Sequence, residues 1–323
     1  MSTTPRGDMD PQTDADGRLR HLLSLQGLSR AQLETLLRRA QGLTQHAYGG
    51  TGARHALAGK AVCTLFFEPS TRTRSSFSLA AQRLGADLLN FDASTSSTTK
   101  GEADIDTLKT LEAMGVHAFV VRHKRDGAVA ELAAAANPGT VLLNAGDGRS
   151  NHPTQGLLDM LTLRQAKGDD FSRLKVLVVG DVKHSRVARS DLHALRILGC
   201  GEIRVCGPAA LLPDDGTLDG CVVGDDVDAM IEGVDALMTL RLQRERMVEG
   251  MVASLDDYHR DFGLTAERLQ RAAEDAIVMH PGPMNRGVEI SDEVADGPQS
   301  RVLRQVANGV AVRMAVLEAL LAD

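Results

Sequence analysis

The sequence lacks the cysteine pattern of a disulfide scaffold, a redox dithiol or a zinc site. Its four cysteines form no CxxC pair and have no histidine at zinc-finger spacing: Cys63, Cys200, Cys206 and Cys221. It also lacks an apolar run near the ~20 residues that cross a bilayer, and an apolar segment after Met1 that would mark a signal peptide. We therefore expect reduced, buried thiols, no metal or other cofactor, and a cytoplasmic protein.

An excess of positive charge is missing as well. The 323 residues carry 36 Lys and Arg against 43 Asp and Glu, for a net charge of −7. The electrostatic field of a negatively charged protein attracts neither nucleic acid nor an anionic membrane, so we expect neither as a partner. Any anionic ligand must instead be bound by a local cluster of basic side chains.

Two nucleotide-binding patterns are incomplete. The run 178–181, Val-Val-Gly-Asp, ends a predicted strand but is not followed by GxGxxG, so it gives no reason to propose NAD. The Gly-rich segment 49–60 ends in Gly-Lys, but Ala61 stands where a phosphate-binding loop needs Ser or Thr. HExxH and GxSxG are also absent, which removes the usual metalloprotease and serine-hydrolase signatures.

What the sequence does contain is an alternation of short apolar strands and helices. Strands are predicted at 61–67, 87–91, 117–121, 140–143 and 174–179, and near Ile203, Ala236 and Ile277. Helices are predicted after Ser29, at 72–84, through Leu108 and Leu111, at 153–167 and at about 300–321. The alternation predicts an α/β fold whose parallel sheets are covered by helices on both faces.

The length exceeds what one hydrophobic core usually supports, so we expect two domains, each a parallel sheet flanked by helices. We assign residues 1–17 to a disordered tail, 18–152 plus about 304–323 to a first domain, and 153–303 to a second. A long helix after His152 would join the two, because Pro153 suits a first helical position. The C-terminal helix would return to the first domain.

A phosphate site is predicted where the strand 61–67 meets the helix 72–84. Pro69 ends the strand, and Ser-Thr-Arg-Thr-Arg at 70–74 then places hydroxyl, backbone N–H and guanidinium groups at one helix N-terminus. The positive end of the helix dipole and bidentate guanidinium donors suit a phosphate. The alternative is a capped helix with two solvated arginines, but the buried strand and the proline before it favour the phosphate site.

The run Phe-Phe-Glu-Pro-Ser-Thr-Arg-Thr-Arg at 66–74 resembles the carbamoyl phosphate motif of aspartate and ornithine carbamoyltransferases. A second shared motif is His-Pro-Thr-Gln at 152–155, preceded by Asn-Ala-Gly-Asp-Gly at 144–148, and the resemblance extends from about residue 20 to the end. It implies that the phosphate is held by Ser70, Thr71, Arg72 and Thr73. It implies further that the carbamoyl oxygen is held by Arg122, His152 and Thr73, and the carbamoyl amide by Gln155.

The segment 280–283, His-Pro-Gly-Pro, resembles the family's closing loop, whose backbone carbonyls accept the carbamoyl amide hydrogens. We predict a cis peptide bond before Pro283, since X-Pro bonds adopt this form at little cost. Ornithine enzymes carry a Cys at the position of Gly282, which speaks against that acceptor. Many aspartate enzymes carry a larger residue there.

The acceptor side resembles the aspartate enzymes. Arg241 and Gln243 lie in the segment after a predicted strand, and Arg186 lies at a predicted helix start. Two arginines suit a dicarboxylate, although each could also be a solvated charge at the end of an element. The loop 94–102 resembles the one by which aspartate enzymes insert a Ser and a Lys, here Ser96 and Lys100, into a neighbouring subunit's site; alone, it would be a flexible polar loop.

Together the motifs imply transfer of the carbamoyl group of carbamoyl phosphate to L-aspartate, an early step of pyrimidine biosynthesis. No covalent nucleophile is required, and the catalytic groups would be Arg72, Thr73, Arg122, His152 and Lys100. Two alternatives stay open: a carbamoyltransferase for another amino acid such as ornithine, and an inactive structural homologue. A crossing Lys100 implies a homotrimer with shared active sites, which could also associate with a regulatory or dihydroorotase-like chain.

Overall fold

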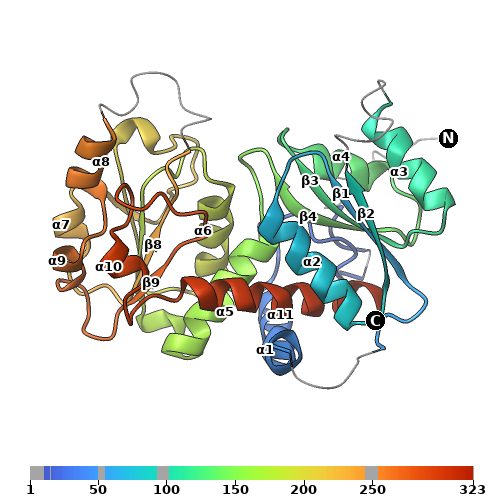
Figure 1. Cartoon of the computed structure of the whole chain (residues 1–323), viewed down its shortest axis with the longest axis horizontal. Helices are drawn as coiled ribbons and strands as arrows, with labels where there is room; N and C mark the ends of the chain where they lie inside the picture. Colours follow the sequence, from blue (N-terminus) through green and yellow to red (C-terminus); the bar gives the residue numbers. More distant parts are fainter. Residues whose placement is uncertain (1–10, 15, 50–54, 93–101, 244–253, 323) are drawn as a thin grey trace, which may run out of the picture.

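The computed structural model describes residues 11–14, 16–49, 55–92, 102–243 and 254–322. The chain forms two lobes, each built around a parallel sheet with helices on both sides (Figure 1). The sheet of the first lobe has the order β2-β1-β3-β4, and that of the second lobe has the order β7-β6-β5-β8-β9. All of these pairings are parallel, so the predicted α/β fold class is confirmed.

The predicted strands lie within a few residues of their expected places. In the first lobe they are β1 (Ala61–Phe66), β2 (Asp87–Asp92), β3 (Ala118–His123) and β4 (Val141–Asp147). In the second lobe they are β5 (Lys175–Val179), β6 (Glu202–Cys206), β7 (Val222–Gly224), β8 (Ala236–Thr239) and β9 (Ile277–Met279). Only β7 was not predicted, because it is three residues long and its two valines are exposed.

The helices also follow the predicted alternation, but α4, where an Ala-rich run lacks a capping side chain, α8 and the single-turn helices were not predicted. The longer ones are α1 (Arg30–Ala47), α2 (Thr71–Arg83), α3 (Asp104–Ala113), α4 (Ala128–Ala135), α5 (Pro153–Lys167), α6 (Arg186–Leu198), α8 (Leu255–Phe262) and α11 (Val302–Leu321). Single-turn helices are α7 (Val227–Met230), α9 (Ala266–Leu269) and α10 (Asp292–Ala295).

Local chemistry explains where α1 begins. The Ser29 hydroxyl accepts a hydrogen bond from the Gln32 backbone N–H at 3.2 Å, and the Gln32 side chain accepts one from the Ser29 N–H at 2.8 Å. This reciprocal capping box satisfies two N–H groups that would otherwise lack partners, and contributes about 1 kcal/mol. The leucines that follow at helical spacing form the buried face of α1.

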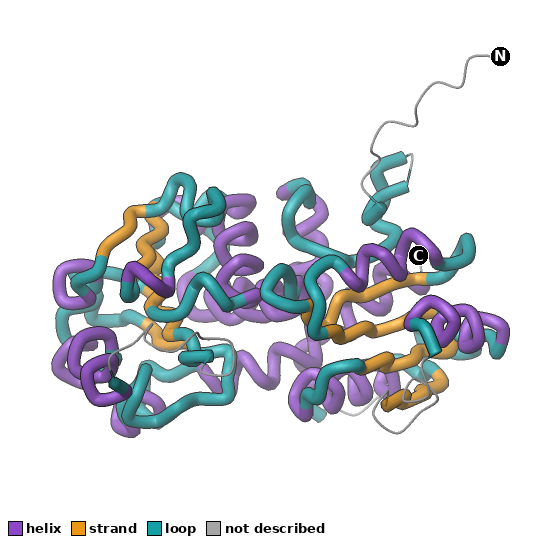
Figure 2. The backbone as a smooth tube through the Cα atoms, turned by 90° about the horizontal axis from the view of Figure 1, so that it is seen from above, coloured by secondary structure: helices purple, strands orange, loops and turns teal. Residues whose placement is uncertain are grey.

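Two helices connect the lobes. α5 leads from the first lobe to the second and packs on α6, and α11 packs on α5 and then on α1 and α2 (Figure 1). Viewed from above, the strands form two separate groups with helices between them (Figure 2). The largest apolar core nevertheless runs without a break from Val62 of β1 through Leu157 of α5 to Val178 of β5.

The expected disordered tail is wrong at residues 11–14, which are folded against the first lobe. Gln12 is only 3% exposed, and its side-chain oxygen accepts hydrogen bonds from the backbone N–H groups of Leu23 at 2.8 Å and Ser24 at 2.7 Å. A polar amide makes this anchor, so no apolar pattern could indicate it. Residues 1–10 and 15 lie outside the described part of the chain.

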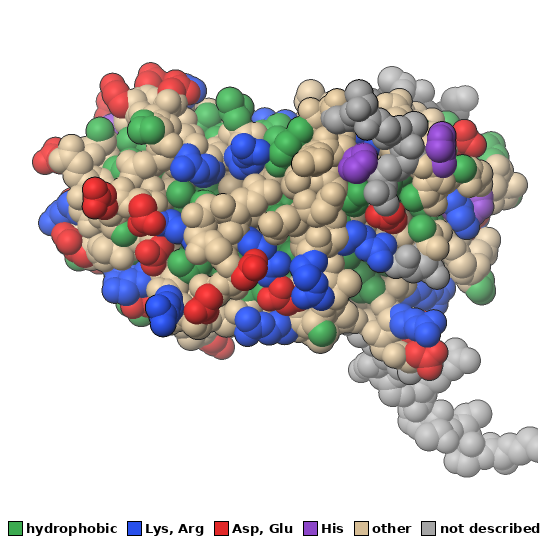
Figure 3. Space-filling model, turned by 90° about the horizontal axis from the view of Figure 1, so that it is seen from below, with side chains coloured by type: hydrophobic (Ala, Val, Ile, Leu, Met, Phe, Trp, Pro, Cys, Tyr) green, Lys and Arg blue, Asp and Glu red, His purple; other side chains and the backbone are tan. Residues whose placement is uncertain are grey.

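The described residues contain no helix with the length and apolarity needed to span a membrane, and no group of three His, Cys, Asp or Glu side chains placed to hold a metal ion. All four cysteines are free. Burial raises the pKa of the Cys63 thiol to about 12, so this thiol stays protonated. On the face shown in Figure 3, acidic and basic side chains are interspersed.

Candidate active site

A cavity of about 200 Å³ lies between the lobes, at the ends of strands β1, β3, β5, β8 and β9. Ligands of open α/β sheets bind at the carboxyl ends of the strands, so this is the expected place for a site. The first lobe contributes Glu68, Ser70, Arg72, Thr73, Arg122, His152 and Gln155 to its lining. The second lobe contributes Arg186, Arg241, Gln243, Gly282 and Pro283, and α11 contributes Gln305 and Arg313.

The residues of the predicted phosphate site lie at the start of α2. Ser70 occupies the N-cap position with extended backbone angles (φ −160°, ψ 109°), and its hydroxyl makes no capping hydrogen bond. The hydroxyl and the first N–H groups of α2 can therefore donate to a ligand, as helix N-termini do to phosphate. Thr73 is buried, whereas Thr71 is exposed and does not line the cavity.

Two of the guanidinium groups that line the cavity, Arg72 of the first lobe and Arg241 of the second, lie near each other. Burial, and then the charge of Arg241, lower the pKa of Arg72. The two cations thus repel each other, and an anion bound between them would relieve the repulsion.

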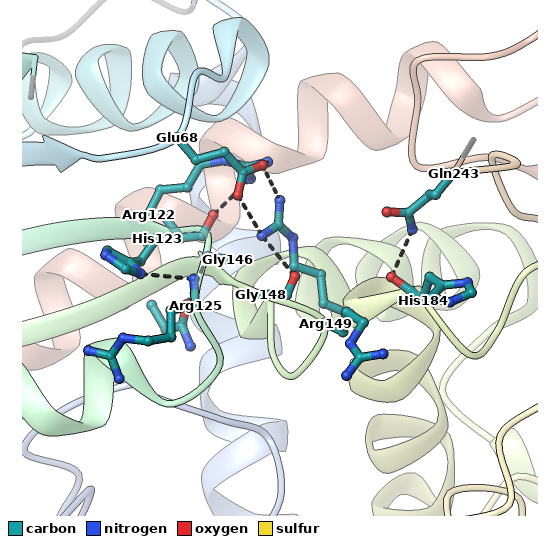
Figure 4. A network of polar contacts seen from close by, with 12 residues as sticks. Glu68, Arg122, His123, Arg125, Gly146, Gly148, Arg149, His184 and Gln243 are labelled. Carbon is teal, nitrogen blue, oxygen red and sulfur yellow. Dashed lines mark hydrogen bonds and ion pairs between the residues drawn. The ribbon is translucent and has the colours of Figure 1, made fainter. Parts of the chain in front are cut away.

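Glu68 joins the lobes through two arginines. Its Oε1 lies 2.7 Å from Nη2 of Arg122 and 2.9 Å from Nη2 of Arg186, and its Oε2 accepts a further bond from Arg186 at 3.1 Å. Figure 4 shows the Glu68 carboxylate meeting Arg122 at the end of β3. Burial alone would raise the pKa of Glu68, but hydrogen bonds and charge from Arg186 and Arg122 outweigh it and lower the pKa.

The motif at 144–148 holds these arginines by its backbone. Arg122 donates to the Ala145 carbonyl at 3.1 Å, and Arg186 donates to the Gly148 carbonyl at 3.2 Å. Gly146 has φ +114°, and a Cβ atom there would lie 3.0 Å from both guanidinium groups. Glycine is required at this position for its backbone angle and for the close approach of the side chains.

His152 occupies the N-cap position of α5, without a side-chain capping hydrogen bond, and lines the cavity. It is 4% exposed, its backbone N–H donates to the Ser190 hydroxyl at 2.9 Å, and its Nδ1 has no partner among the described residues. Burial, followed by the charges of Arg122, Arg186 and Arg313, lowers the pKa of His152 well below its usual value. The imidazole is therefore neutral, with one N–H to donate.

We expect the His152 side chain to show no titration when the pH of the ligand-free protein is lowered from about 8 to about 5.5, because both burial and nearby cations oppose protonation. Histidine ¹⁵N chemical shifts of the folded protein would measure this. In urea the same ring should titrate near the ordinary value of about 6.5. A folded-state midpoint near 6.5 would contradict the neutral assignment.

On the acceptor side, Arg241 and Gln243 follow β8 and line the cavity. The Gln243 side chain donates to the carbonyl of His184, a residue of the loop after β5, at 3.0 Å (Figure 4). This contact ties the segment after β8 to the loop after β5. Ser96 and Lys100, the residues predicted to enter a neighbouring subunit, lie outside the described residues.

The closing loop follows β9 and lies over the start of α2. The Gly282–Pro283 bond is cis, which confirms the prediction. Gly282 has φ +65°, and a Cβ atom there would lie 3.3 Å from Cζ of Arg72. The Gly282 N–H donates to the His280 ring at 2.8 Å, and the opposite ring nitrogen lies 3.2 Å from Glu289.

Residues 20–165 match the profile of the aspartate/ornithine carbamoyltransferase carbamoyl-P binding domain, and residues 172–320 match that of the Asp/Orn binding domain. The chain is 76% identical over 310 residues to the aspartate carbamoyltransferase catalytic subunit of Xanthomonas campestris pv. campestris (strain B100), covering 96% of this chain and 98% of that one.

Two solved structures are similar to the whole chain. Aspartate transcarbamoylase from Trypanosoma cruzi in complex with carbamoyl phosphate has 32% identity and a TM-score of 0.83, with 96% of this chain and 98% of that chain covered. Ornithine carbamoyltransferase from Thermus thermophilus has 29% identity and a TM-score of 0.82, with 94% and 99% covered. The fold alone therefore does not distinguish the two acceptors.

Proposed function

The chain belongs to the aspartate/ornithine carbamoyltransferase family, and from this premise we propose that the cavity between its lobes binds both reactants and stabilises the transition state. The reaction is transfer of the carbamoyl group of carbamoyl phosphate to the amine of L-aspartate, giving N-carbamoyl-L-aspartate and phosphate. The observation that carries the proposal is that the start of α2, Arg122 and His152 line one and the same cavity.

The donor is held by its phosphate. Ser70 and Thr73 provide hydroxyl groups at the α2 N-terminus, and Thr71, whose side chain lies outside the cavity lining, provides a backbone N–H of the first turn. Arg72 provides a guanidinium that can bond two phosphate oxygens at once. Negative charge grows on the phosphate as the bond between the carbamoyl carbon and the phosphate oxygen breaks. Arg72 therefore acts as the clamp on the leaving group.

The carbamoyl oxygen becomes an oxyanion during attack. Arg122, the neutral His152 and the Thr73 hydroxyl form a set of donors for it, since all three line the same cavity. The carbamoyl amide donates its hydrogens to the Gln155 side chain and to backbone carbonyls near Gly282 and Pro283. These contacts hold the carbamoyl carbon where the amine can reach it.

The acceptor is bound by its two carboxylates. Arg186, Arg241 and Gln243 from the second lobe line the cavity and provide guanidinium and amide donors. Lys100 adds a further cation in this proposal. The neutral amine of aspartate forms a bond to the carbamoyl carbon, the bond from that carbon to the phosphate oxygen breaks, and the departing phosphate takes the amine proton. No covalent enzyme intermediate is formed.

Several charge contacts are needed to account for enzymatic rates. One contact near 4 Å contributes up to about 4 kcal/mol at an effective dielectric of about 20, before desolvation is subtracted. Enzymes lower barriers by about 8 to 23 kcal/mol, so three or more contacts must act together. Positioning of the two mutually repelling anions accounts for the remaining reduction of the barrier.

Assembly, domain limits and cellular role complete the proposal. The donor domain comprises residues 18–152 and about 304–323, and the acceptor domain residues 153–303. The active unit is a homotrimer in which Ser96 and Lys100 enter the neighbouring subunit's site, and it can associate further with a regulatory or dihydroorotase-like chain. The reaction serves pyrimidine biosynthesis in the cytoplasm.

A steady-state assay with carbamoyl phosphate tests the function directly. We expect rapid phosphate release with L-aspartate and almost none with ornithine, because Arg186 and Arg241 repel a cationic side chain. Arg241→Met should raise the KM for aspartate about tenfold or more through loss of a charge-assisted hydrogen bond, with little change in the KM for carbamoyl phosphate. Turnover of ornithine in place of aspartate would overturn the acceptor assignment.

A further inference from the structure

Two buried carboxyl groups lie directly behind the cavity. Asp159 of α5 and Asp191 of α6 are 0% and 1% exposed, and the charge of Asp159 acts directly on Asp191. Ionised carboxylates can only accept hydrogen bonds, so a bond between two of them requires one proton. Burial raises the pKa of Asp159 to about 7, and burial together with the charge of Asp159 raises that of Asp191 well above its usual value.

The other partners show which of the two carries the charge. Asp159 accepts hydrogen bonds from the Gln155 amide at 3.1 Å to each oxygen, and from the Gln305 amide at 2.7 Å. The charge of the buried Arg313 also favours the ionised form of Asp159. Neither oxygen of Asp191 has a hydrogen-bond partner among the described residues. The proton therefore lies on Asp191, which can donate it to the Asp159 carboxylate.

The Asp159 carboxylate fixes the direction of both amides. A carboxylate can only accept hydrogen bonds, so Asp159 must face the NH₂ group of Gln155. The carbonyl oxygen of Gln155 then points away from Asp159, on the side where Gln155 lines the cavity. The same constraint turns the carbonyl oxygen of Gln305 to the His280 backbone N–H, which it accepts at 2.9 Å. One buried charge thus orients a cavity side chain and anchors the start of the closing loop.

We propose that Asp159, held ionised by the acid Asp191, is a positioning residue that makes Gln155 an obligate acceptor and so selects a carbamoyl NH₂ over the methyl of acetyl phosphate. The inference rests on the proposed role of Gln155 at the carbamoyl amide. Acetyl phosphate has nearly the same shape but leaves the Gln155 oxygen unpaired. Sites built to hydrogen-bond a substrate group discriminate strongly against analogues that lack it.

The test compares phosphate release from carbamoyl phosphate and acetyl phosphate, each with aspartate. Asp159→Asn presents an NH₂ group at one of the two positions where the carboxylate had an acceptor, so it no longer obliges the Gln155 amide to face it with its NH₂; when the new NH₂ faces Gln155, that amide turns over. We expect the ratio of kcat/KM for carbamoyl over acetyl phosphate to fall at least about tenfold. In the matched Asp191→Asn variant, the new NH₂ can donate to Asp159 as the acid can, so the ratio should stay within about threefold of wild type.

The outcomes separate this inference from the proposed function. If the wild-type chain does not carbamoylate aspartate, the proposed function is wrong. If it does, and folded Asp159→Asn keeps the wild-type ratio, only the positioning role is wrong. Should Asp159→Asn not unfold cooperatively, neutron diffraction of the deuterated wild-type protein decides: we expect a deuteron between Asp159 and Asp191 and the Gln155 ND₂ facing Asp159. A Gln155 oxygen facing Asp159 would overturn the inference.

Discussion

The Arg72→Ala variant is expected to lose about 10³-fold in kcat, while its free energy of unfolding stays within about 0.5 kcal/mol of wild type. Arg72 as a residue is exposed in the ligand-free protein, while partial burial of its guanidinium and the charge of Arg241 both disfavour the charged form, so the fold gains little from it. Its contribution arises when the phosphate leaves. Steady-state kinetics and urea unfolding of the same preparations measure the two effects.

Arg83→Ala is the matched control, because it removes the same charge from the same helix. Arg83 lies in the last turn of α2 and donates to the Ala47 carbonyl at the end of α1. Its loss should cost about 1 kcal/mol of stability and change kcat less than about twofold. If both variants lost stability and turnover in the same proportion, the leaving-group role of Arg72 would be refuted.

Mixing two inactive variants, Arg72→Ala and Lys100→Ala, is expected to restore up to about one quarter of wild-type activity. The proposed trimer builds each site from the Arg72 of one subunit and the Lys100 of its neighbour. After random exchange of equal amounts, about one site in four receives both intact residues. Subunits would be exchanged by mild dissociation and reassociation, and activity measured per chain.

A second mixture controls for nonspecific reactivation. Arg72 and His152 line the same cavity of one chain, so Arg72→Ala mixed with His152→Ala can form no complete site. This mixture should stay inactive. Recovery in both mixtures, or in neither, would contradict shared active sites.

Local patterns in the sequence were sufficient for much of the fold. Ser29, Pro69 and Pro153 act on their own neighbours, and the α1, α2 and α5 boundaries lie within a residue or so of the predicted ones. The cis bond before Pro283 was also predicted, because the resemblance covers that loop. Besides the single-turn helices, three elements were missed: β7 is three residues long with exposed valines, the Ala-rich α4 has no capping side chain, and α8 has a capping serine but buries only Tyr258.

The site shows where local reasoning ends. Glu68 was part of the recognised motif, but its bond to Arg186 spans 118 positions, and no spacing rule predicts that contact. Asp159 and Asp191 read as ordinary polar positions on two helices until the packing of α5 on α6 brings them together. A signal was present in hindsight, since an acid on an otherwise fully buried helical face needs a partner.

The unbroken apolar core beneath the cavity limits how the enzyme can move. A chain whose lobes met only through a linker could swing open like a hinge, but here such a swing would expose Leu157 and its neighbours to water. Rearrangement during turnover should therefore proceed by shear, a sliding of α5, α6 and α11 over one another by small side-chain adjustments. Solvent entry would then be governed by the loops at the mouth, while the floor of the site stays dry throughout the cycle.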